Sequence, residues 1–181
     1  MKQKNMAIYT GLFATLIIIG AFIKIPTPII PFTLQFLFVS LSGLLLGAKY
    51  GSLSALIYAG LGLAGIPVFT GGGGITYVLQ PTFGYILGFV VCSFITGYLS
   101  EKLEANMKNY ILSAVSGLIV LHILGIPYYY FISHNIIENN LSFNQIFLFC
   151  FVYTFPFDFL LSILGAKLAL RLKPLLSNGE K

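Results

Sequence analysis

The sequence predicts an all-α integral membrane protein that crosses the bilayer six times. Of its 181 residues, 57% are hydrophobic and only 8% are charged, and the mean hydropathy is +0.93. Soluble domains carry roughly 25% charged residues, so this composition excludes a soluble fold. The length suits about six spans of roughly 20 apolar residues joined by short loops. We therefore expect one transmembrane domain over residues 1–181.

Proline, glycine and polar clusters divide the chain into six apolar segments, because these residues end helices or begin turns. The first segment follows two lysines, as a signal peptide would, but no small-residue cleavage site follows it, so we expect it to be retained. The expected spans cover residues 6–25, 33–48, 51–66, 82–100, 109–132 and 144–172.

The distribution of basic residues predicts the orientation. If the N-terminus is cytoplasmic, only Lys24 lies at an outer end of a span. Cytoplasmic ends are enriched in Lys and Arg, so both termini should be cytoplasmic. The basic residues are dispersed, so the net charge of +5 does not indicate nucleic acid. Nine basic residues occupy inner ends: Lys2, Lys4, Lys49, Lys102, Lys108, Lys167, Arg171, Lys173 and Lys181.

An uncharged segment from Gly65 to Phe89 contains four consecutive glycines, Gly71–Gly74. Each glycine costs a helix about 1 kcal/mol relative to alanine, and non-helical backbone at bilayer depth survives only inside protein or beside a water-filled cavity. A loop that wraps a small ligand is favoured over an ordinary connector, which remains the alternative. The candidate ligand contacts of this segment are Gly73, Gly74, Tyr77, Gln80 and Tyr85.

Asp158 is the sharpest single candidate, because it stands within an apolar stretch of the last span. A carboxylate at a helix centre costs about 2.5–3.5 kcal/mol on insertion scales, so it faces a cavity or a partner. Pro156 removes one backbone donor just before it and can kink the helix. The alternative is a structural Asp whose carboxylate neighbouring hydroxyls or amides satisfy.

The first outer loop supplies further polar candidates. Its three prolines rigidify the backbone, and Thr33 and Gln35 follow with neutral donors and acceptors. Lys24 is suited to meet a ligand carboxylate, although snorkelling to lipid headgroups explains it equally well.

Three motifs together resemble the BioY family, the biotin-specific membrane subunits (S components) of energy-coupling factor transporters. The first is I-K-I-P-x-P-x-x-P-x-T-L-Q, from Ile23 to Gln35. The second is G-I-P-V-F followed by the glycines, from Gly65 to Gly74, and the third is P-T-F-G-Y-x-x-G-F, from Pro81 to Phe89. The resemblance covers nearly the whole chain.

The resemblance implies a six-helix subunit of a prokaryotic-type plasma membrane that binds biotin from outside. It also implies a transmembrane partner and two cytoplasmic ATPases. Family members dock that partner through small residues on span one, where this chain has Ala7, Gly11 and Thr15. Many members carry an Asp in span six with a Lys three residues later; here Asp158 matches, whereas Leu161 replaces the Lys.

Biotin would suit these residues, since it has two ureido N–H donors, one ureido carbonyl, an apolar bicycle and a carboxylated tail. Asp158 or Gln80 would accept the N–H groups, while Phe36 and the tyrosines would enclose the rings. Lys24 would replace the missing Lys at the carboxylate. Two alternatives stay open: an S component for lipoate or dethiobiotin, and a membrane scaffold subunit without a ligand.

The sequence offers no catalytic site. No Gly-Lys-Ser/Thr follows Gly71–Gly74, so the run is not a P-loop, and we expect ATP hydrolysis only in partner subunits. His122 and His134 lack further metal ligands at a useful spacing, and His122 is interpreted as a packed or interfacial residue. The protein is therefore predicted to be a transport subunit rather than an enzyme, with no metal or cofactor.

Overall fold

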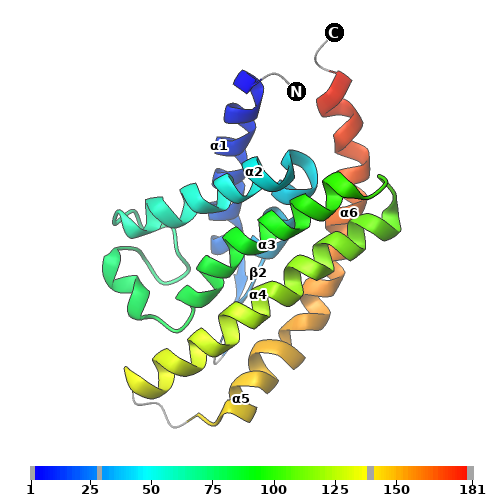
Figure 1. Ribbon diagram of the computed structural model, residues 1–181. Coiled ribbons are helices and arrows are strands. Elements are labelled where there is room, and N and C mark those ends of the chain that lie inside the picture. The colour runs from blue at the N-terminus through cyan, green and yellow to red at the C-terminus, as the bar shows by residue number, and fades with distance from the viewer. Residues whose placement is uncertain (1–2, 28–29, 138–140, 179–181) are drawn as a thin grey trace.

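The computed structural model describes residues 3–27, 30–137 and 141–178, which form a bundle of long helices with one small strand pair (Figure 1). Lys2, Pro28 and Lys181 lie outside these ranges. Within them, five helical runs are long and apolar enough to cross a membrane. The long helices are α1 (Gln3–Phe22), α2 (Gln35–Leu63), α3 (Phe83–Lys102), α4 (Met107–Asn135) and α6 (Thr154–Asn178). The beginning of α1 and the end of α6 lie at the same end of the bundle.

Helix α2 covers most of the second and the third expected span, and it bends sharply at Gly47. This residue has φ 78° and ψ −177°, a conformation that is essentially restricted to glycine. The chain folds back there. As a result, a Cβ on Gly51 would lie only 2.9 Å from the Cα of Gly43. Figure 1 shows the cyan second half of α2 crossing α1 at a steep angle. The break that the glycines of this region predict is therefore present, but inside one helical run.

Glu101, at the end of α3, stabilises this bend. Its Oε1 accepts a hydrogen bond of 3.2 Å from the backbone N–H of Ala48, the first residue after Gly47. The N–H groups at the start of a helical segment have no partner within the segment, and a carboxylate there is also favoured by the helix dipole. The second half of α2 therefore begins with a side-chain cap supplied by another helix.

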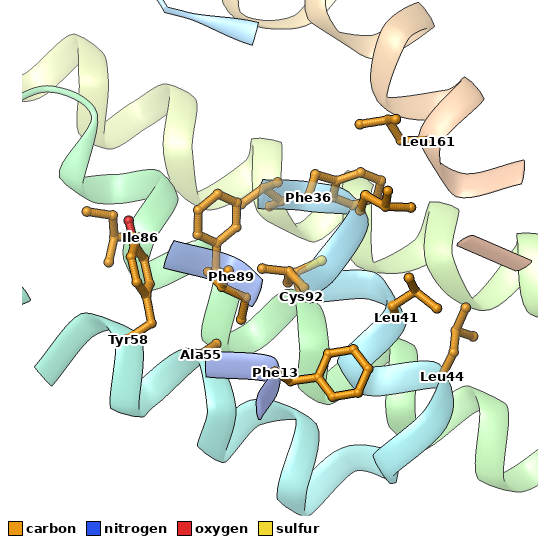
Figure 2. Close-up of a cluster of buried hydrophobic side chains, with 14 of the residues drawn as sticks. Phe13, Phe36, Leu41, Leu44, Ala55, Tyr58, Ile86, Phe89, Cys92 and Leu161 are labelled. Carbon is orange, nitrogen blue, oxygen red and sulfur yellow. The ribbon is translucent and has the colours of Figure 1, made fainter. Parts of the chain in front are cut away.

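Small residues let the inner helices approach closely, as is typical of membrane proteins. A Cβ on Gly97 of α3 would lie 2.4 Å from the backbone nitrogen of Ala48, and one on Gly43 would lie 2.6 Å from the carbonyl oxygen of Ser93. Figure 2 shows the apolar core that results, with Phe13 of α1, Phe36 of α2 and Leu161 of α6 around it. Leu161 is 7% exposed and belongs to this core.

The last expected span is not one uniform helix. It begins with α5 (Phe143–Phe147), continues as a π-helical turn η2 (Leu148–Val152), and then becomes α6. At the junction, the N–H of Tyr153 donates to the carbonyl oxygen of Leu148, 3.1 Å away. Pro156 lies in the first turn of α6, where its missing N–H costs little. The irregularity in this span is therefore a π-helical turn that ends before Pro156.

Two connecting segments have more structure than expected. In the loop between α1 and α2, β1 (Lys24–Ile25) and β2 (Phe32–Thr33) pair antiparallel, with Lys24 opposite Thr33. After α2, the glycine segment turns back on the helix, and the 3-10 helix η1 (Ile75–Leu79) leads to α3. The loop expected from Ser133 begins later, because α4 continues to Asn135.

Candidate functional site

A cavity lies among the strand pair, the start of α2, the glycine segment and helices α3, α4 and α6. It offers about 70 Å³ to the centres of water-sized molecules, where roughly 10–15 Å³ already holds one water. Apolar side chains such as Phe36, Phe89 and Leu121 form much of its wall. Its polar lining residues are Thr33, Gln35, Tyr58, Thr70, Tyr77, Thr82, Tyr85, His122, Thr154 and Asp158.

On the glycine-segment side, Tyr77 of η1 organises the wall. Its hydroxyl lies 3.3 Å from Oγ1 of Thr70 and 3.4 Å from Oγ1 of Thr82. Its ring packs at 4.6 Å from the ring of Phe69. The residues before and after η1 are therefore held together through one phenol group.

On the α2 side, Gln35 is 4% exposed, and its Nε2 donates to the hydroxyl of Tyr58 over 2.8 Å. Thr33 lies beside it, with 3.4 Å between its Oγ1 and Oε1 of Gln35. A buried amide retains this pairing because an unpaired polar group inside protein costs free energy. Tyr58 comes from the second half of α2, so the bend at Gly47 brings both residues to the same wall.

Asp158 contributes its side chain to the cavity from the second turn of α6. Its backbone carbonyl oxygen accepts from Ser162 Oγ over 3.0 Å, but its carboxylate makes no hydrogen bond or ion pair with any other described residue. The rings of Phe157 and Phe32 lie 5.4 Å apart next to it. The accepting capacity of this carboxylate is therefore not used by any described residue.

Helices α4 and α6 meet at a second polar group on the same wall. Nε2 of His122 lies 3.1 Å from Oγ1 of Thr154, and that oxygen lies 2.8 Å from the carbonyl oxygen of Cys150. The hydroxyl of Tyr85 makes a longer contact, 3.5 Å, with the same carbonyl oxygen.

The structure brings six of the ten predicted ligand contacts to the cavity, and four lie outside its lining. Gln80 is exposed at the end of η1. Gly73 and Gly74 pack against the end of α2, where the N–H of Gly74 donates to the carbonyl oxygen of Gly62 over 2.7 Å. Lys24 donates through Nζ to the carbonyl oxygen of Thr70 over 2.8 Å. The six lining residues are Thr33, Gln35, Phe36, Tyr77, Tyr85 and Asp158.

Sequence reasoning missed several lining residues, chiefly Tyr58, Thr70, His122 and Thr154. Thr70 immediately precedes the four glycines, and Tyr58 lies in the second half of α2. No local sequence pattern marks either residue as part of a site. His122 had a signal, since a His inside an apolar span needs a partner. That signal was assigned to packing, whereas the ring is both packed and part of the cavity wall.

The predicted docking residues lie apart from the cavity. Ala7, Gly11 and Thr15 share one exposed face of α1, and a Cβ on Gly11 would meet nothing within 4 Å. Ile8 and Leu12 extend this face, being 70% and 50% exposed. Nothing described in the chain covers it.

A second hollow, of about 450 Å³, lies at the bend of α2 and shares no lining residue with the first. It is lined by Met6, Glu101 and Lys173 among others. Nζ of Lys173 lies over the ring of Tyr110 at 5.1 Å from its centroid, and Glu101 is engaged with Ala48. Both charged side chains of this hollow therefore already interact with other residues of the chain.

The fold and the first cavity together define a multi-pass membrane protein that encloses a site for a small molecule. The sequence model of the BioY family matches residues 1–178. The chain therefore belongs to the BioY family.

Comparison with individual relatives gives the same family. The chain is 46% identical over 175 residues to the probable biotin transporter BioY of Lysinibacillus sphaericus, covering 95% of this chain and 89% of that protein. It is 40% identical over 169 residues to the biotin transporter BioY of Thermotoga maritima, covering 93% and 95% of the two chains. Its fold is similar to the crystal structure of the S component for biotin from an ECF-type ABC transporter. That match has a TM-score of 0.82, 27% identity, and coverage of 96% and 95%.

Proposed function

We propose that this chain is the biotin-binding S component of an energy-coupling factor uptake transporter. The observation that carries the proposal is the cavity itself, lined by residues of the long helices α2, α3, α4 and α6 and holding a carboxylate without a hydrogen-bond partner among the described residues. Membership of a family whose relatives are biotin transporters supplies the ligand. The scaffold alternative gives no reason for such a cavity.

The chemistry of the wall suits biotin. Asp158 accepts a ureido N–H, and the aromatic side chains of Phe36, Tyr77 and Tyr85 enclose the apolar bicycle. Neutral donors are also present, since the hydroxyls of Tyr77 and Thr70 reach the cavity. Leu161 belongs to the core, so the acid tail is met by other groups. Lys24, which donates to the Thr70 carbonyl beside the glycines, is the cation that we propose for this role.

In the proposed membrane topology, the chain has six spans and both termini lie in the cytoplasm. The bend at Gly47, which gives α2 two helical segments, supports the number of spans. Two observations support the orientation. The beginning of α1 and the end of α6 lie at the same end of the bundle, and nine of the ten basic residues fall at the span ends that this orientation places inside. The strand pair and the glycine segment then face outside, where biotin enters.

Delivery of biotin requires a transmembrane partner and two ATPase subunits, which supply the energy. The exposed face of α1 around Gly11 is the proposed docking surface for the transmembrane partner, because small residues there allow a partner helix to approach closely. The protein itself contributes capture rather than catalysis.

Binding of radiolabelled biotin to the detergent-purified chain tests the function. We expect retention at nanomolar biotin, with unlabelled biotin as the effective competitor. Retention of lipoate or dethiobiotin in place of biotin would assign the protein to a related vitamin. A chain that retains none of the three would support the scaffold alternative and contradict the proposal.

Gly11→Leu is expected to abolish co-purification with the transmembrane partner and to leave biotin binding to the isolated chain unchanged. The added side chain has open space in this chain, so it disturbs the partner surface rather than the fold. Ser116→Leu is the matched control, since Ser116 lies on α4 and its hydroxyl bonds only its own helix, at the Leu112 carbonyl. Normal assembly of Gly11→Leu would remove this face from the interface.

A further inference from the structure

The contacts of His122 fix where its protons and that of Thr154 lie. His122 is 3% exposed and Thr154 7% exposed, and both line the cavity. Nδ1 of His122 lies 2.9 Å from the carbonyl oxygen of Leu118, which can only accept, so Nδ1 carries a proton. Nε2 then faces the Thr154 hydroxyl, 3.1 Å away.

The Thr154 hydroxyl has one hydrogen and two protein groups that take it. If the imidazole is neutral, the hydrogen goes either to Nε2 of His122 or to the carbonyl oxygen of Cys150, 2.8 Å away. If the ring carries two protons, Nε2 donates to Thr154 and the hydroxyl donates to Cys150. In every arrangement the hydroxyl hydrogen is bound within the protein, so Oγ1 of Thr154 meets a ligand only as an acceptor.

A second acceptor lies one helical turn further along α6. Residues four apart share a helix face, about 5–6 Å between Cβ atoms, and Asp158 lies four residues after Thr154 on the same cavity wall. Two neighbouring acceptors suit a ligand with two N–H donors on one small group, such as a cyclic urea.

We infer that Thr154 binds one N–H of the ligand beside Asp158, and that His122 is the residue that positions Thr154. A threonine in a helix divides between two χ1 rotamers, and the bond to His122 selects the one that keeps Oγ1 on the wall. The rings of His122 and Phe151 meet edge to face with 5.2 Å between their centroids. This packing holds the imidazole in place. The inference rests on the proposed function and deepens it, since it names the part of the ligand that this wall recognises.

Variants of both residues separate this role from packing. Thr154→Val removes the hydroxyl and keeps the shape, and we expect it to weaken biotin binding about fivefold, the effect of one hydrogen bond. Thr154→Ser should retain near wild-type affinity. His122→Phe should weaken binding about two- to threefold in the wild-type background and not at all in the Thr154→Val background. His134→Phe, on the same helix, is the control, because His134 stacks on Tyr130 away from the cavity.

Affinities for ligand analogues distinguish a direct contact by Thr154 from a purely structural role, which would affect all analogues alike. Two mono-N-methyl biotins each lack one ureido N–H. We expect Thr154→Val to leave affinity for one of them unchanged, while it weakens biotin and the other analogue. An equal loss for biotin and both analogues, or additive effects of His122→Phe and Thr154→Val, would overturn the inference. If His122→Phe does not fold, the Val and Ser variants of Thr154 still test whether Thr154 binds a ligand N–H. Failure of the wild-type chain to retain biotin at all would instead contradict the proposed function.

Discussion

Asp158→Asn is expected to weaken biotin binding at least tenfold, which corresponds to about 1.4 kcal/mol. The carboxylate has no hydrogen-bonding partner among the described residues and lines the cavity, so its accepting capacity is available to the ligand. The amide replaces one acceptor oxygen with an N–H₂ group, which opposes a ligand N–H. A buried ligand N–H left without its acceptor costs about 1–3 kcal/mol, which agrees with a loss of this size.

Equilibrium titration of purified protein with biotin measures this effect. Glu104→Gln is the matched control, because it makes the same acid-to-amide change in an exposed loop residue outside the cavity. We expect the control to bind as the wild type does. Unchanged affinity in Asp158→Asn would remove this carboxylate from the binding site, and a loss of folded protein in detergent would assign it a structural role.

Gly47→Ala is expected to lower the free energy of unfolding by about 2–4 kcal/mol. The backbone at this position has φ 78°, which costs a residue with a Cβ about 1–3 kcal/mol. The new methyl group would also lie 1.8 Å from Oε1 of Glu101. Glu101 must then move and lose its bond to the N–H of Ala48, and a lost helix cap adds about 0.5–2 kcal/mol.

The midpoint of thermal aggregation in detergent, compared between variants, reports this change. Gly60→Ala is the control, since Gly60 lies in the same helix with open space around its Cα and no strained φ. Alanine is the better helix former, so we expect the control to be as stable as the wild type or slightly more stable. Equal stability of the two variants would show that the bend tolerates a side chain.

Much of the helix arrangement could be predicted from the sequence, because chain breaks and small residues have local causes. The fourth and fifth expected spans, 82–100 and 109–132, lie within α3 and α4. Gly84 and Gly88 of α3 pack internally, against Tyr128 and Leu121 of α4. The break near Gly47 was predicted, but the cap that Glu101 gives it was not, because Glu101 is distant in sequence.

The site was predicted less completely, for a physical reason. In a helix that is apolar on all sides, the hydrophobic pattern does not show which face is inward. Asp158 could be found because a charge in such a helix needs an interior environment. Thr154 and His122 could not be placed on the wall, since small hydroxyls bond their own backbone in many helices and the ring's partner is 32 residues away. Gln80 had the right chemistry, but η1 directs it outward.

The bond between Lys24 and the Thr70 carbonyl has a kinetic consequence. It fastens the strand pair to the glycine segment, and both segments supply lining residues of the cavity. We expect a molecule enclosed between them to leave only after this bond breaks, so its affinity would depend mainly on the dissociation rate. Under the proposed function, a long residence time would give the loaded subunit time to meet the partners that deliver its cargo.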